Sequence, residues 1–100
     1  MTTMNHQEII SWMREAAPNA QLASDSRRIK AGDVFFAYPG DAKDGRTFIA
    51  AAIANGAAAV VYDDTDYAWD AAHAVPHLAV PGLKKQAGPI AHAWYGQPDA

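Results

Sequence analysis

The chain has 100 residues, of which 50% are hydrophobic and 19% charged, with a formal net charge of −3 and no cysteine. This size and balance indicate one small globular domain, and they argue against a general binder of nucleic acid or of anionic membranes, because both need a basic surface. The lack of cysteine excludes a disulfide scaffold and a thiolate metal site, and it fits a cytoplasmic protein. The first 16 residues do not have the pattern of a signal peptide, and no apolar run approaches the roughly 20 residues of a membrane span.

The first half of the chain predicts a helix followed by two strands. Residues 5–17 carry apolar side chains at helical spacing. Residues 22–25 predict a short strand, and the aromatic and β-branched residues at 34–38 predict a second one. Between the two strands, Gly32 predicts a turn that needs a positive φ.

The second half alternates helices and strands. The predicted elements are a helix at 47–55, a strand at 57–62, a short helix at 67–74, a strand at 77–80 and a helix at 83–95. Gly56 is placed to end the first of these helices with a positive φ, and Pro89 predicts a kink or a late start in the last. This alternation predicts an α/β fold, a small layered sandwich with a mixed, mostly parallel sheet flanked by helices.

The segment GDAKDGRT, Gly40 to Thr47, is one residue away from the P-loop pattern G-x-x-x-x-G-K-[ST]. Arg46 stands in place of the lysine that reaches the phosphates, and no later strand clearly supplies an aspartate for magnesium, which argues against a small P-loop NTPase. The alternative is a tight turn in which Asp44 or Thr47 caps the following helix. That turn remains compatible with an anion bound at the same helix start.

A second polar cluster, SDSRR, follows the first predicted strand. Ser24 and Ser26 are candidates to hydrogen-bond a base, a ribose or a phosphate. The simpler interpretation is local: Asp25 and Ser26 bond to nearby backbone, and Arg27 pairs with Asp33 or Asp44.

The residues outside these two clusters predict no catalytic site. The four histidines lie on different predicted elements, and no serine, histidine and acid form a recognisable nucleophile motif. From the residues themselves we therefore expect an α/β domain with one loop region suited to an anionic ligand.

The stretch SDSRRIKAGDVFFAYPGDAKDGRTFI, followed by AAAIANGAAAVVYD, resembles the N-terminal domain of the bacterial Mur ligases, which build the peptide stem of peptidoglycan. The family pattern D-S-R, G-D-[LV]-F-x-A, x-x-G, D-G-[RH]-x-F and A-x-x-x-G-A-A-A is met at Asp25–Arg27, Gly32–Ala37, Gly40, Asp44–Phe48 and Ala52–Ala59. The resemblance implies a Mur-type α/β substrate-binding domain over residues 1–96, with residues 97–100 beginning a linker to an ATP-binding domain.

Two features favour one branch of the family. At the turn, this chain has D-G-R, where the branch that adds D-alanyl-D-alanine usually has D-G-H. The ending AHAWYGQPDA also resembles the branch that adds the third stem residue to UDP-MurNAc-L-Ala-D-Glu. That third residue is expected to be meso-diaminopimelate. The D-alanyl-D-alanine branch and a stand-alone, non-catalytic binding module stay open as alternatives. The resemblance implies that ATP and Mg²⁺ act in the remaining domains of a longer parent enzyme, and that this chain alone is inactive.

The resemblance also implies that this domain holds the uridine-diphosphate end of the substrate, UDP-MurNAc-dipeptide. The contacts carried over residue by residue are Ser24, Ser26, Asp41, Ala42 and Lys43. To these we add Arg46, from its place near the predicted helix start, as a partner for the diphosphate. No metal-binding or catalytic residue is expected in this chain.

Overall fold

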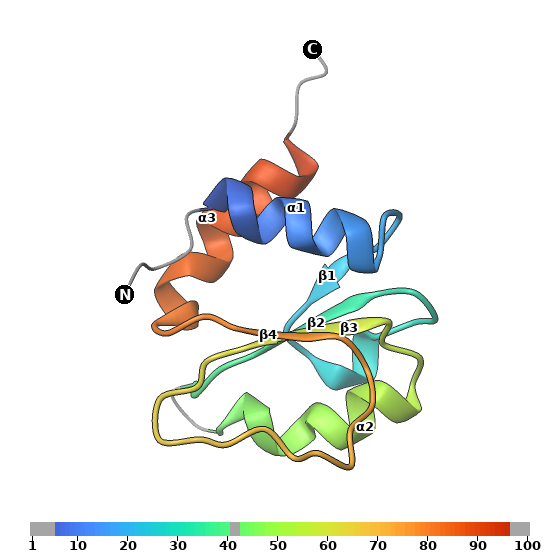
Figure 1. The fold of residues 1–100 in the computed structure, drawn as a ribbon, viewed down its shortest axis with the longest axis vertical. Coiled ribbons are helices and arrows are strands. Elements are labelled where there is room, and N and C mark those ends of the chain that lie inside the picture. The colour runs from blue at the N-terminus through green and yellow to red at the C-terminus, as the bar shows by residue number, and fades with distance from the viewer. Residues whose placement is uncertain (1–5, 41–42, 97–100) are drawn as a thin grey trace.

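The computed structural model describes residues 6–40 and 43–96. One sheet forms the middle layer, with helices α1 and α3 packed on one face and helix α2 on the other (Figure 1). The helices are α1 His6–Ala16, α2 Ile49–Ala54 and α3 Leu83–Tyr95. The strands are β1 Leu22–Ala23, β2 Val34–Ala37, β3 Ala59–Tyr62 and β4 His77–Ala79.

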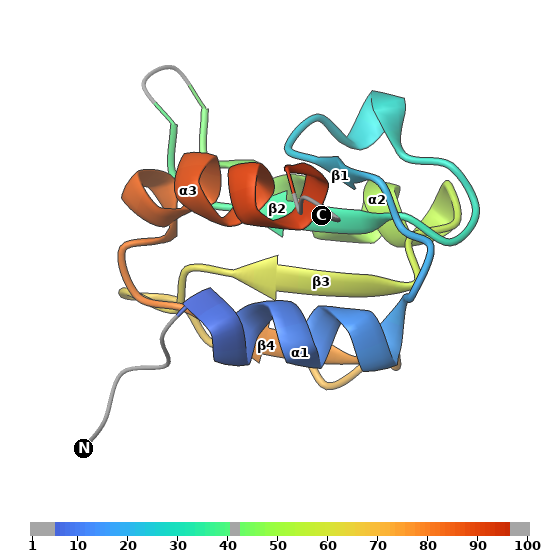
Figure 2. The same cartoon turned by 90° about the horizontal axis from the view of Figure 1, so that it is seen from above.

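The four strands lie in the order β1-β2-β3-β4, and each pairs with its neighbour in parallel. In the view from above, strand β3 is seen between helices α1 and α3 (Figure 2). The predicted α/β sandwich is confirmed, and its sheet is parallel throughout the described residues. In a parallel sheet the carboxyl ends of all strands meet at one edge, so the loops that follow β1 and β2 are neighbours there.

The two central strands, β2 and β3, are buried on both sides, which explains their continuous apolar sequences. In β2, Val34 and Phe36 join the core under α1 and α3, whereas Phe35 and Ala37 join the core under α2. Strand β3 alternates in the same way, and all four of its residues are buried. The strand predicted at 57–62 is confirmed, and its continuous apolar run fits a position buried on both faces.

The prediction of a helix at 67–74 is wrong, since the chain between β3 and β4 is irregular. Trp69 explains the difference: its ring packs 5.0 Å from the ring of Tyr62 and stacks on His77 at 3.9 Å. The carboxylate of Asp70 accepts from the backbone N–H two residues later, at 2.9 Å, and so stabilises a turn. Packing of one aromatic ring on β3 and β4 thus outweighs the weak helical propensity of this segment.

Two short 3-10 helices, η1 Ser26–Arg28 and η2 Gly45–Phe48, were not predicted. Helix α2 begins at Ile49 after η2, so the helix predicted at 47–55 is divided into two parts. Each 3-10 helix follows an aspartate at the edge of the sheet, and together they shape the loops that follow β1 and β2.

Helix α3 begins at Leu83 and continues through Pro89, so the late start did not occur. Proline removes a backbone donor, and its ring collides with the Cβ of the preceding residue. That preceding residue is Gly88, which has no Cβ, so one of the steric costs of Pro89 is relieved. No helix in the described part of the chain is long and apolar enough to cross a bilayer.

Candidate functional site

A cavity of about 570 Å³ lies at the carboxyl ends of β1 and β2. This edge is where open parallel α/β sheets hold their ligands. The cavity is lined by Ser24, Asp25, Ser26, Arg27, Phe36, Tyr38, Gly40, Lys43, Gly45, Phe48 and Ala51. Its walls combine hydroxyl groups and cationic side chains with an apolar, partly aromatic surface.

The cavity brings together three of the residues predicted from the sequence. Ser24 and Ser26 come from the loop after β1, and Lys43 comes from the loop after β2. Ser24 and Lys43 are exposed, whereas Ser26 is only 8% exposed. The predicted contacts Asp41 and Ala42 lie outside the described residues.

Both loops contain the same local motif, an aspartate two residues before an arginine. Asp25 accepts from the backbone N–H of Arg27 at 3.0 Å, and Asp44 accepts from that of Arg46 at 2.9 Å. In each pair the guanidinium also binds the carboxylate, with Nη2 at 2.9 Å from Oδ2. Each aspartate therefore caps a 3-10 helix. Asp44 caps η2 and not α2, the helix for which the cap was predicted, and α2 has no side-chain cap.

The two motifs differ in burial. The side chain of Arg27 is 87% exposed at the cavity, whereas that of Arg46 is 8% exposed. The prediction that Arg27 pairs with Asp33 or Asp44 is wrong, because Arg27 pairs with Asp25. Asp33 instead accepts from the backbone N–H of Lys30 at 3.0 Å, within the turn before β2.

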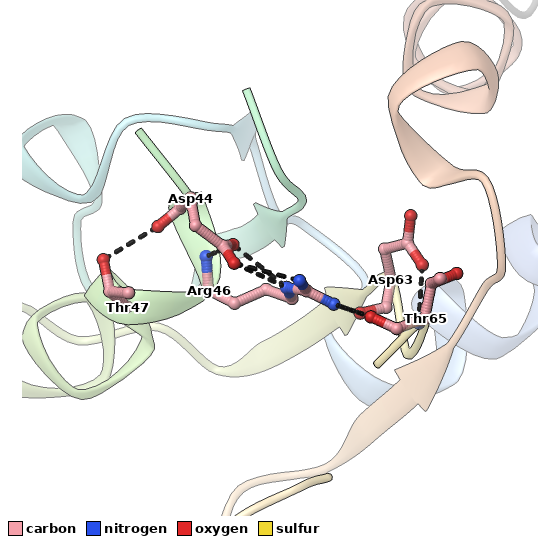
Figure 3. Close-up of polar contacts among 5 residues, drawn as sticks. All are labelled: Asp44, Arg46, Thr47, Asp63 and Thr65. Carbon is pink, nitrogen blue, oxygen red and sulfur yellow. Dashed lines mark hydrogen bonds and ion pairs between the residues drawn. The ribbon is translucent and has the colours of Figure 1, made fainter. Parts of the chain in front are cut away.

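Arg46 connects the loop after β2 to the loop after β3 (Figure 3). Its Nη1 donates to the carbonyl oxygens of Asp63 at 2.8 Å and Thr65 at 2.6 Å, and its guanidinium lies 4.9 Å from the ring centroid of Tyr67. On the other side of the guanidinium, Nε and Nη2 donate to the carboxylate of Asp44. Arg46 does not line the cavity, so a direct contact with a diphosphate does not fit its position.

Two backbone amides of the P-loop-like segment, those of Gly45 and Thr47, already have partners within the chain. The N–H of Gly45 donates to the carbonyl of Tyr38 at 2.9 Å, and the N–H of Thr47 donates to the carbonyl of Asp44 at 3.0 Å. The Thr47 hydroxyl donates to the same carbonyl at 2.8 Å. A P-loop needs these amides for phosphate and this hydroxyl for magnesium, so the segment does not fit ATP. The described residues also contain no cluster of three side chains suited to a metal.

Both aspartate side chains are stabilised in their charged forms. Hydrogen bonds from Arg27 lower the pKa of Asp25 to about 2. The side-chain hydrogen bond from Arg46 lowers the pKa of Asp44 and outweighs the opposing effect of burial. Both carboxylates are therefore ionised at neutral pH.

We expect the Asp25 pKa to rise toward about 4, the value of an unperturbed aspartate, in an Arg27→Met variant. Because the pKa of Asp25 is lower in the folded state, its contribution to stability is present above the unfolded value and is lost as the pH falls from about 4 to about 2. NMR titration of the side-chain carboxyl carbons measures this directly. Asp44 serves as the internal control, and an unchanged Asp25 pKa would contradict the assignment.

The fold and the cavity together define a parallel α/β domain whose polar loops enclose a ligand-sized cavity at the carboxyl edge of the sheet. Comparisons with known proteins give the class a name. A family model described as "Mur ligase family, catalytic domain" matches residues 20–95. The chain belongs to the Mur ligase family.

Curated relatives are similar over most of this chain. It is 54% identical over 99 residues to UDP-N-acetylmuramoyl-L-alanyl-D-glutamate--2,6-diaminopimelate ligase of Janthinobacterium sp. (strain Marseille), covering 99% of this chain and 20% of that relative. It is 50% identical over 76 residues to the ligase of the same name from Neisseria meningitidis serogroup A / serotype 4A, covering 75% of this chain and 15% of that relative. The chain thus spans a fifth or less of the length of these relatives.

Two solved structures share the fold. The structure of a UDP-N-acetylmuramoyl-L-alanyl-D-glutamate--2,6-diaminopimelate ligase aligns with a TM-score of 0.60 and 25% identity, over 98% of this chain and 20% of the other. MurF ligase from Thermotoga maritima in complex with ADP aligns with a TM-score of 0.59 and 26% identity, over 78% of this chain and 17% of the other.

Proposed function

We propose that this chain is the N-terminal, UDP-binding domain of an ATP-dependent amide ligase. The parent enzyme would add meso-diaminopimelate as the third residue to UDP-MurNAc-L-Ala-D-Glu in peptidoglycan synthesis. The observation that carries the proposal is the cavity itself, because two loops predicted to hold the nucleotide meet there. The relatives that are 50% and 54% identical are named for this reaction, which favours it over the D-alanyl-D-alanine branch.

The chemistry of the cavity supports a nucleotide ligand. Its volume of about 570 Å³ lies within the range of roughly 300–1,000 Å³ typical of small-molecule sites. Ser24 and Ser26 offer hydroxyl groups to a ribose or a base, and Lys43 offers a positive charge to a diphosphate. We keep Asp41 and Ala42 as contacts proposed from the resemblance, and we assign Arg46 to positioning the loop.

ATP and Mg²⁺ belong to other parts of the parent enzyme in this proposal. The amides of Gly45 and Thr47 already bond to carbonyls of this chain and are not free for a triphosphate, and the described residues hold no candidate metal cluster. The partners of this domain are therefore the UDP-MurNAc-dipeptide substrate and the ATP-binding and C-terminal domains. By itself the chain would bind the nucleotide and form no amide bond.

Titration of UDP-MurNAc-dipeptide into the ¹⁵N-labelled chain tests this function. We expect the amide signals of Ser24, Ser26 and Lys43 to shift in a saturable way. Lys43→Gln should weaken binding about 2- to 5-fold, since a partly exposed ionic contact contributes up to about 1 kcal/mol. Lys85→Gln, which removes the same charge from α3, is the matched control. No shift at these positions at millimolar ligand would remove the proposal.

A further inference from the structure

One aromatic side chain that lines the cavity, Phe48, is exposed and is not part of the buried core. Among the described residues, the large hydrophobic side chains that remain exposed are Phe48, at 37%, and Tyr95, at 55%. Tyr95 lies at the end of α3, away from the cavity, whereas Phe48 lines it. Single exposed rings are common on protein surfaces, so the groups around Phe48 determine whether it is suited to contact a ligand.

The backbone holds the ring of Phe48 in place. Phe48 is the last residue of η2, which Asp44 caps at its start. Two residues earlier, Arg46 anchors the same turn in a buried network, and one residue later Ile49 is 1% exposed in the core. Phe48 therefore projects to the cavity from a segment that is fixed on both sides.

A positive charge lies beside this ring. The Nζ of Lys43 is 5.8 Å from the centroid of Phe48, within the range of a cation–π contact. Arg27, which is ion-paired with Asp25, adds a second exposed cationic group to the cavity lining. An aromatic face next to two cations complements a ligand that joins a flat ring to a negatively charged group.

We propose that Phe48 is the platform on which the base of the nucleotide stacks, with Lys43 and Arg27 placed toward the phosphates. This inference rests on the proposed function and deepens it, because it names the residue that distinguishes a nucleotide from a sugar phosphate. A base stacked on an aromatic side chain contributes about 1–3 kcal/mol, which corresponds to roughly a 5- to 150-fold change in affinity.

The test uses uridine diphosphate with the wild-type chain, Phe48→Leu and Phe48→Tyr. In the wild type, the ring current of Phe48 should shift the uracil H5 and H6 signals upfield as the ligand binds. Phe48→Leu keeps an apolar side chain without a π face, so the shift should disappear and the affinity should fall at least 5-fold. Phe48→Tyr keeps the ring and should retain both.

Pyrophosphate, which has no base, is the ligand control, and its affinity should be the same in all three proteins. An equal uridine-diphosphate affinity and an equal H5 and H6 shift in the wild type and Phe48→Leu would overturn the platform while leaving the proposed function intact. A wild-type chain that binds no uridine diphosphate would overturn both. Matching thermal unfolding of the three proteins shows that the fold is unchanged.

Discussion

An Arg46→Met variant is expected to lose about 2–4 kcal/mol of unfolding free energy, because it removes a buried cation from its partners. The substitution breaks the ion pair with Asp44 and leaves the carbonyls of Asp63 and Thr65 without the donors they have now. The long methionine side chain keeps much of the packing against Tyr67. The loss therefore reports mainly on the polar contacts that join the two loops.

Arg27→Met is the matched control for this experiment. It removes the same residue type from the same aspartate-x-arginine motif. The Arg27 side chain, however, is 87% exposed, and its guanidinium bonds to the carboxylate of Asp25. We expect a clearly smaller loss of stability than in Arg46→Met, because solvent screens the exposed ion pair between Arg27 and Asp25. Urea unfolding followed by circular dichroism, with m-values compared, measures both variants. Equal losses in the two proteins would show that burial does not distinguish the motifs.

A Gly56→Ala variant is expected to lose about 2–3 kcal/mol, because two backbone constraints act at one residue. Gly56 has a φ of 113°, and its carbonyl accepts from the N–H of Gly32 at 3.0 Å. A Cβ at this position would lie 2.7 Å from the Cα of Ala31 and 2.9 Å from its nitrogen. These contacts involve backbone, which cannot move aside as a flexible side chain does.

Gly82→Ala separates the two constraints. Gly82 also has a positive φ, 72°, but a Cβ there meets nothing within 4 Å. Its cost should be about 1 kcal/mol, the value of a left-handed conformation alone. Thermal and urea unfolding of both variants give the difference. If Gly82→Ala were as costly as Gly56→Ala, the close approach of Ala31 would have no part in the effect.

Much of the fold follows from local sequence patterns. The residues at 34–38 and 57–62 predicted strands, and the structure places both in the buried centre of the sheet. Gly32 and Gly56 were predicted at positions that need a positive φ, and both have one. A cap by Asp44 could also be predicted, because its carboxylate accepts from a backbone N–H only two residues further along the chain.

The candidate site could be predicted only in part. The resemblance to the Mur ligases implied that Ser24, Ser26 and Lys43 contact one ligand, and the parallel pairing of β1 and β2 brings their loops to one cavity. Phe48 was missed as a site residue, although the family pattern D-G-[RH]-x-F contains it. Its exposure was the informative signal, and exposure is not visible in a sequence.

The two aspartate-x-arginine motifs show where sequence information ends. The sequence is enough to place a polar turn after each of the first two strands, because each aspartate bonds to an arginine two residues away. Which arginine is buried depends on carbonyls 17 and 19 residues further along the chain, at Asp63 and Thr65. Only the parallel packing of β3 against β2 brings those carbonyls to Arg46. The tertiary structure therefore decides that Arg46 supports the loop while Arg27 faces the cavity.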